Sequence, residues 1–204
     1  MNRILVVVVV LFVAVIGLAW WWQSNLISNS QLSNSSSAET LSTEDMFASL
    51  SGEEFDKAYL MDMLALHQGA LNMASQASSK TTHPEIIELS DEIIATQTDE
   101  IRQMLEWQKQ WGHIGSDPHA GHAMEGGGMA EAMAEMTAKL YDLEGSRFDE
   151  EFLRQMIAHH KQAIEMSRHA ENNAYQKEIQ QLAESIIDTR QSEIITMEQL
   201  LKSD

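Results

Sequence analysis

Apolar residues recur at spacings of three and four along two long stretches of the chain, which is the period of an amphipathic helix. Residues 55–77 read FDKAYLMDMLALHQGALNMASQA, and residues 148–170 read FDEEFLRQMIAHHKQAIEMSRHA. The two stretches align without a gap at an offset of 93 residues, and the alignment continues through a second apolar pattern, 86–104 and 179–197. The repeat predicts one helical hairpin that occurs twice. Two such hairpins bury their apolar faces most simply in one four-helix bundle, so the predicted fold class is all-α.

Local signals predict where these helices begin and end. Ser51 and Glu54 match a capping box ahead of the first long helix. The Thr-His-Pro stretch at 82–84 predicts the start of the second helix, because proline is tolerated in a first turn. The Asn-Asn pair at 172–173 predicts the equivalent turn in the second hairpin.

Histidines interrupt the apolar faces of the first helix in both copies. His67 and His160 occupy the same repeat position, among aliphatic neighbours. His159 stands where the first copy has Leu66. Burying an imidazole without a polar partner costs about 1–3 kcal/mol, so each histidine is expected to have one.

Glutamates interrupt the apolar faces of the two return helices at matched positions, Glu100 and Glu193. We predict that they lie behind the histidines, where they could orient an imidazole, neutralise an imidazolium or join a cation site. If the first turn lies near residues 80–81, Glu100 comes about a turn and a half from His67.

The adjacent histidines favour a metal site, because neighbouring positions on a helix differ by about 100° and cannot both be simple core. Imidazole together with thioether suits soft ions such as Cu(I) and Ag(I). Methionines lie at helical spacing from the histidines in both copies. The predicted bundle ligands are His159, His160, Met156, Met166, His67 and Met63. The alternatives are histidines bonded to carboxylates and methionines that only fill the core.

A His- and Met-rich insert, residues 112–146, separates the two copies. Its first part is rich in glycine and is not expected to form a stable helix, whereas its second part carries methionines at helical spacing. We predict a second capture site here, with His119, His122, Met124, Met129, Met133 and Met136 as ligands. The alternative is that the methionine stripe packs the insert onto the bundle.

The N-terminal end has a different composition. The run Ile4–Trp22 is uncharged, follows Arg3 and ends in three tryptophans, which is typical of a membrane-spanning helix. We expect a single-pass signal anchor over residues 1–22, a Ser/Asn-rich tether over 23–42 and the bundle over 43–204. Arg3 favours a bundle on the extracytoplasmic side of the cytoplasmic membrane.

Charge and motifs narrow the class of function. The formal net charge of −18 argues against nucleic-acid binding and favours the attraction of cations. The sequence has no cysteine, which excludes thiolate sites and disulfides. It also lacks the Glu-x-x-His motif of bundle di-iron enzymes, the His-Glu-x-x-His motif of zinc proteases and a phosphate-binding loop. We therefore expect a binding protein and not an enzyme.

The second copy also resembles the signature of a bacterial family, the domain-of-unknown-function family number three hundred and five. The matching residues are Phe148, Asp149, Phe152, Leu153, Met156, Ile157, His159, His160, Ala163, Ile164 and Met166. Residues 96–105 resemble the family's second-helix signature, and residues 190–200 are a weaker copy of it. The resemblance implies a ferritin-like four-helix bundle, secreted or anchored, with copper or silver binding in some members. Leu66 departs from the His-His pair of many first copies, which favours the second copy as the site.

These patterns together predict a membrane-anchored extracytoplasmic protein that binds copper, as Cu(I) or Cu(II), or silver. Its role would be buffering, resistance or transfer of the ion to a partner protein that the sequence does not identify. The alternative is a metal-free helical-bundle interaction protein whose histidines are structural.

Overall fold

A computed structural model describes residues 47–113 and 128–203 of the chain. The described residues all lie in one compact unit, Leu41–Asp204. The predicted anchor and tether, residues 1–22 and 23–42, lie outside them. Within the described ranges, no helix has the length and apolar character needed to cross a membrane.

Helices make up nearly all of the described structure. They are α3 (Gly52–Ala74), α4 (Ala77–Lys80), α5 (Pro84–Gln110), α6 (Gly128–Ala138), α7 (Ser146–Asn173) and α8 (Lys177–Ser203). The described residues contain no strand ladder, only an isolated bridge between Gly52 and Ala174. The all-α prediction is confirmed.

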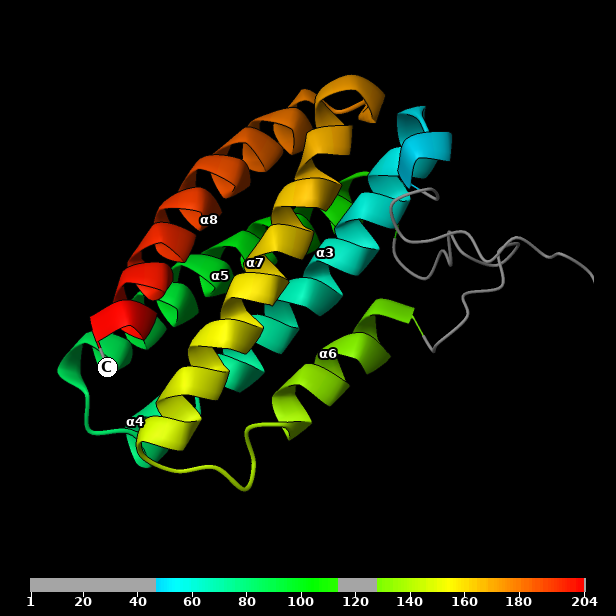
Figure 1. The fold of residues 1–204 in the computed structure, drawn as a ribbon. Helices are drawn as coiled ribbons and strands as arrows, with labels where there is room; N and C mark the ends of the chain where they lie inside the picture. The colour runs from blue at the N-terminus through cyan, green and yellow to red at the C-terminus, as the bar shows by residue number, and fades with distance from the viewer. Residues whose placement is uncertain (1–46, 114–127, 204) are drawn as a thin grey trace, which may run out of the picture. The chain divides into compact units, whose positions relative to one another are not determined.

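The four long helices form a bundle of two hairpins. α3 packs against α5 and α7, and α7 packs against α8 (Figure 1). α3 and α7 run side by side in opposite directions, and the insert helix α6 packs on α3 (Figure 1). This arrangement brings the repeated histidine helices together at the centre of the bundle.

The helix ends agree in part with those predicted from the sequence. α5 begins at Pro84 with His83 as its N-cap residue, as predicted. Ser51 is the N-cap residue of α3, but its side chain makes no capping hydrogen bond, so the predicted capping box is wrong. Glu54 instead contacts Lys57 at 2.8 Å. The asparagine pair at 172–173 ends α7, and the turn that it was expected to form begins at the next residue.

Two buried aspartates join the hairpins to each other. The carboxylate of Asp56 on α3 accepts hydrogen bonds from the backbone N–H groups of Tyr175 and Gln176, both at 3.0 Å, just ahead of α8. Asp149, at the matched position on α7, lies 3.7 Å from the Nδ1 atom of His83, the N-cap residue of α5. Each first helix thus contacts the start of the other hairpin's second helix, where an anion is favourable.

The core consists of two apolar clusters. One contains Phe55, Tyr59 and Leu66, and the other contains Phe148, Phe152 and Ile93. Burying side chains of this size stabilises the fold by about 1.5–3 kcal/mol each. The polar centre described below lies among these apolar residues, so its groups are shielded from water.

Candidate metal centre

His159 and His160 lie side by side in the core. The His159 ring is 1% exposed and the His160 ring is fully buried. Their Nδ1 atoms are 3.4 Å apart. The Nε2 atom of His159 lies 2.7 Å from the backbone carbonyl oxygen of Leu66 on α3, and the Nε2 atom of His160 lies 2.7 Å from Oε2 of Glu193 on α8. Each ring is therefore held at Nε2 by an oxygen and turned towards its neighbour at Nδ1.

These contacts assign the protons on the two rings. A carbonyl oxygen only accepts, so Nε2 of His159 must donate to Leu66. Glu193 is ionised, so Nε2 of His160 also carries its hydrogen towards the carboxylate, although the angle lies outside hydrogen-bond geometry. Burial lowers the pKa of His159 well below its ordinary value and lowers the pKa of His160, so both rings are neutral. Both Nδ1 atoms are then left with lone pairs that face each other.

A chain of polar contacts continues from His160 across the bundle. Glu193 accepts from Nη1 of Arg190 at 3.1 Å, and Nη2 of the same guanidinium donates to Glu100 at 2.5 Å. Glu100 in turn lies 2.7 Å from Nε2 of His67. The order His67, Glu100, Arg190, Glu193, His160 pairs matched repeat positions around one guanidinium. We refer to these five residues as the polar ladder.

The contacts in the ladder favour the charged form of Glu193. Burial alone would raise the pKa of Glu193, but the contact with His160 and the positive charge of Arg190 outweigh it and lower the pKa. Arg190 is 1% exposed and is among the largest fully buried side chains. A buried charge of this kind persists only when it is paired.

The contact between Glu100 and His67 corrects the expected register. The sequence placed Glu100 about a turn and a half from His67, with the turn near residues 80–81. In the structure α3 ends at Ala74, and the short helix α4 and an extended stretch fill the connection before α5 begins at the predicted Pro84. With this longer connection the carboxylate of Glu100 meets the imidazole of His67.

The sequence of the chain matches the model of a known protein family. The model for the domain of unknown function DUF305 matches residues 25–108 and 56–201. The chain belongs to this family. The resemblance seen in residues 148–170 is confirmed, and the two overlapping matches agree with the internal repeat.

Several solved structures resemble this DUF305 chain. CopM in the Cu(II)-bound form is 32% identical over 72% of this chain and 96% of CopM, with a TM-score of 0.60. CopM in the Ag-bound form obtained by soaking is 30% identical over 72% of this chain and 95% of CopM, with a TM-score of 0.58. The DUF305 fragment from Deinococcus radiodurans is 28% identical over 76% of this chain and 99% of the fragment, with a TM-score of 0.63. No sequence among the curated proteins matches.

The predicted sulfur ligands lie in the apolar core. Met156 belongs to the cluster around Phe148 and Phe152, whereas Met63 and Met166 belong to the other cluster. Within residues 47–113 and 128–203, no three His, Asp or Glu side chains converge on a point that could hold a metal ion. The structure thus brings together His159 with His160, and each glutamate with one histidine, but it does not gather all six predicted bundle ligands around one point.

The insert helix covers α3 with its methionines. Met129 and Met133 are buried and Met136 is partly buried. The amide of Gln162 on α7 donates to the sulfur of Met129 at 3.3 Å. A Cβ atom at Gly69 on α3 would lie 2.8 Å from Met133, so glycine is what lets α6 approach. This packing matches the alternative prediction for the insert, in which its methionines pack it onto the bundle. The predicted ligands His119, His122 and Met124 lie outside the described residues.

Sequence reasoning missed the role of Arg190. It interrupts a row of apolar residues on α8, at the repeat position matched by Gln97, and a basic residue in such a row is a sign of a buried ion pair.

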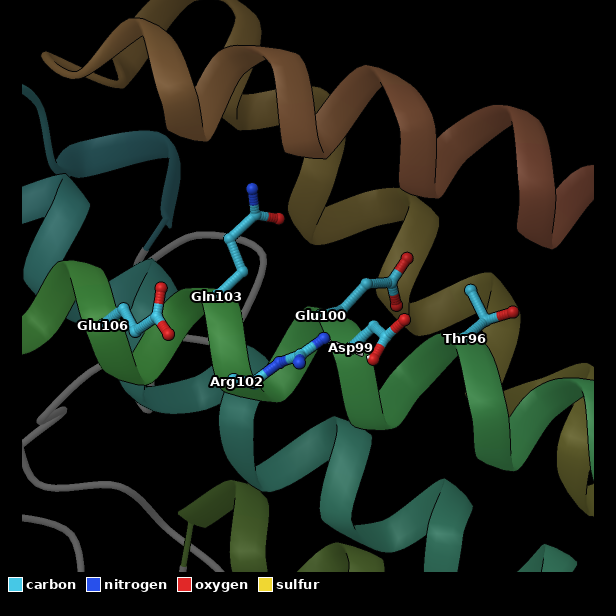
Figure 2. Close-up of a pocket in the computed structure, with 6 residues that line it drawn as sticks. All are labelled: Thr96, Asp99, Glu100, Arg102, Gln103 and Glu106. Atoms are coloured by element: carbon cyan, nitrogen blue, oxygen red, sulfur yellow. Dashed lines mark hydrogen bonds and ion pairs between the residues drawn. The ribbon is translucent and has the colours of Figure 1, made fainter.

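Figure 2 shows Glu100, one of the two partners of Arg190, extending from α5 towards the second hairpin beside an open cavity of about 620 Å³. Thr96, Asp99, Arg102, Gln103 and Glu106 line the rest of that cavity.

Proposed function

We propose that this protein binds a soft monovalent ion, Cu(I) or Ag(I), between the Nδ1 atoms of His159 and His160. The single observation that carries the proposal is the 3.4 Å separation of two buried Nδ1 atoms in rings whose Nε2 atoms each lie 2.7 Å from an oxygen. Two lone pairs at this distance repel each other, and a cation between them removes the repulsion. Two metal–imidazole bonds of about 2.0 Å each are together longer than this separation, so one ion would reach both nitrogens with a bent N–metal–N angle.

The atoms behind the two rings support a ligand role. A metal-ligating histidine usually donates its other ring N–H to a carboxylate or a backbone carbonyl, which fixes the tautomer. His159 has a carbonyl in that place, from Leu66, and His160 has the carboxylate of Glu193. The pair is thus prepared in the tautomer that a metal needs.

The charge of the polar ladder favours a monovalent ion. Two carboxylates, Glu100 and Glu193, share the single guanidinium of Arg190, which leaves one negative charge in excess. One Cu(I) or Ag(I) balances that charge in a region of low dielectric, where an unbalanced charge is costly. The thioethers of Met156, Met166 and Met63 are soft donors that suit the same ions. His67 offers a further nitrogen, because its buried Nδ1 atom has no hydrogen-bond partner among the described residues.

The family supports the choice of ion. CopM has been solved in Cu(I)-bound, Cu(II)-bound and Ag-bound forms, at 30–32% identity to this chain. We further propose, from the sequence of residues 1–42, that the bundle is anchored at the extracytoplasmic face of the cytoplasmic membrane. There it would buffer the ion or pass it to a partner protein without catalysing a reaction. The insert, with His119, His122 and Met124, would serve as a capture site.

A metal-free interaction protein is the second candidate, and one observation favours it. His67 and His160 both contact glutamates that also contact Arg190, so every charged group of the ladder has a partner without any metal. In that case the histidines only stabilise the fold, and the exposed surface of the bundle binds a partner protein.

Titration with Cu(I) under reducing conditions, against a competing chelator, separates the two candidates. The variant H159L installs the residue that the first repeat carries at this position, and H169Q on the same helix is its matched control. We expect H159L to weaken Cu(I) binding by more than about tenfold, because one ligand is lost, and H169Q to leave it unchanged. Equal affinity in wild type and H159L would contradict the bundle site, and no binding in either would favour the metal-free candidate.

A further inference from the structure

Arg190 lies where a metal ion would lie between two carboxylates. Its guanidinium contacts Oε2 of Glu100 at 2.5 Å and Oε2 of Glu193 at 3.1 Å. The same two oxygens face Nε2 of His67 and Nε2 of His160, each at 2.7 Å. Ligating carboxylates in metal sites are usually held by hydrogen bonds from neighbouring groups, and here an imidazole contacts each of the two oxygens.

The internal repeat shows that a single cation serves both copies. Gln97 occupies the position in the first repeat that Arg190 occupies in the second. It is fully buried, and neither its Nε2 nor its Oε1 atom has a hydrogen-bond partner among the described residues. The two glutamates are thus matched by the repeat, whereas the positive charge between them comes from one copy alone.

The surroundings would otherwise draw other cations to this place. Glu100 lines the open cavity of about 620 Å³ on α5 (Figure 2). Asp99 and Glu106 line it too, and they outnumber its one cation, Arg102, which pairs with Asp99 at 2.6 Å. The net charge of −18 raises the concentration of cations near the whole surface. Two carboxylates near each other are the oxygen ligands that hard ions such as Mg²⁺ and Mn²⁺ prefer.

We propose that Arg190 is the built-in occupant of a two-carboxylate cation site, and that it keeps hard divalent ions out of the bundle core. The guanidinium supplies the positive charge that Glu100 and Glu193 require, so no divalent ion gains by entering. The protein is thereby selective for soft ions that bind nitrogen and sulfur. This goes beyond the proposed copper site, because it concerns the Nε2 side of the ladder and the carboxylates.

The test is Mn²⁺ binding, followed by the electron paramagnetic resonance signal of the free ion. R190Q installs the residue that the first repeat carries at this position, removes the charge and adds an amide oxygen. R190K is the matched control, because it retains a positive charge. We expect R190Q to bind Mn²⁺ at least about tenfold more tightly than wild type, R190K to remain like wild type, and R190Q/E193Q to lose the gain.

Two results would overturn the proposal. One is that R190Q binds Mn²⁺ no better than wild type, and the other is that R190K gains as much as R190Q. If R190Q is unfolded without metal, its helical circular dichroism should return with millimolar Mn²⁺, and a chain that stays unfolded would also contradict the proposal. The Mn²⁺ readout does not depend on Cu(I) binding, so a failure here is distinguishable from a failure of the copper site.

Discussion

The Nδ1 atoms of His159 and His160 face each other at 3.4 Å, with both rings buried and each Nε2 atom already engaged. Adjacent residues of a helix normally point about 100° apart, so this approach requires both rings to turn towards a common point. The carbonyl of Leu66 and the carboxylate of Glu193 hold them there. This relationship has consequences for stability as well as for metal binding.

Stability of the metal-free protein should fall on acidification. The folded-state pKa of His159 and of His160 is lowered, so below about pH 6.5 the unfolded chain binds protons that the folded state does not. The free energy of unfolding therefore decreases as the pH falls, by at most about 1.4 kcal/mol per pH unit for each group. Glu193 adds to the loss at lower pH, because its lowered pKa makes its stabilisation disappear as the pH falls through that value. Urea unfolding from about pH 7.5 to about pH 5, in metal-free buffer, measures the slope.

H159L provides the control for this pH dependence. It removes one of the two histidines, so its stability should depend less steeply on pH over the same range. An unchanged slope would mean that His159 is not neutral in the folded protein.

Removing the carboxylate of Asp56 should loosen the joint between the hairpins. D56A loses two hydrogen bonds to the backbone ahead of α8, and we expect it to lower the free energy of unfolding by about 2–3 kcal/mol. D149A is the matched control, because Asp149 makes a longer contact, 3.7 Å, with the half-exposed His83. Chemical denaturation compares them. A smaller loss in D56A than in D149A would contradict the assignment of Asp56 as the stronger link.

The helix α6 should detach when Gly69 gains a side chain. The Cβ atom of G69A would lie 2.8 Å from Met133, closer than carbon atoms pack, and overpacking of this kind costs about 1–3 kcal/mol. We expect faster hydrogen exchange in residues 129–138 of G69A, with the four long helices still protected. In the background of M133G, which removes the Cβ, Cγ and Sδ atoms that would lie 2.8 Å from the added Cβ, the same G69A change should have almost no effect. An equal effect in both backgrounds would show that the contact is not the cause.

The fold was largely predictable because the chain repeats itself. A gapless match of two amphipathic patterns requires two similar hairpins, and hydrophobic periodicity then orients each helix. The register between hairpin helices was less predictable, since it depends on whether residues 77–83 form a turn or a further short helix. In the structure residues 77–80 form α4, and Glu100 contacts His67.

The candidate site was only partly predictable, for a different physical reason. Helical spacing fixes which residues share a face, but it does not fix the rotamers that turn two rings towards each other. It also does not show that the guanidinium of Arg190 reaches across to Glu100 on another hairpin. Met156 and Met166 share helical spacing with the histidines, yet they lie in different parts of the core. The metal roles of these residues, and of His119, His122 and Met124, stay predictions.

Nitrogen NMR of the imidazole rings during titration with Ag(I) tests the central claim most directly. We predict that one equivalent of Ag(I) shifts the Nδ1 resonances of both His159 and His160, while both Nε2 atoms retain their protons. H169Q should show the same shifts, whereas H159L should lose the shift at His160 Nδ1 as well. Shifts confined to other histidines, or metal-induced loss of the Nε2 protons, would contradict the account.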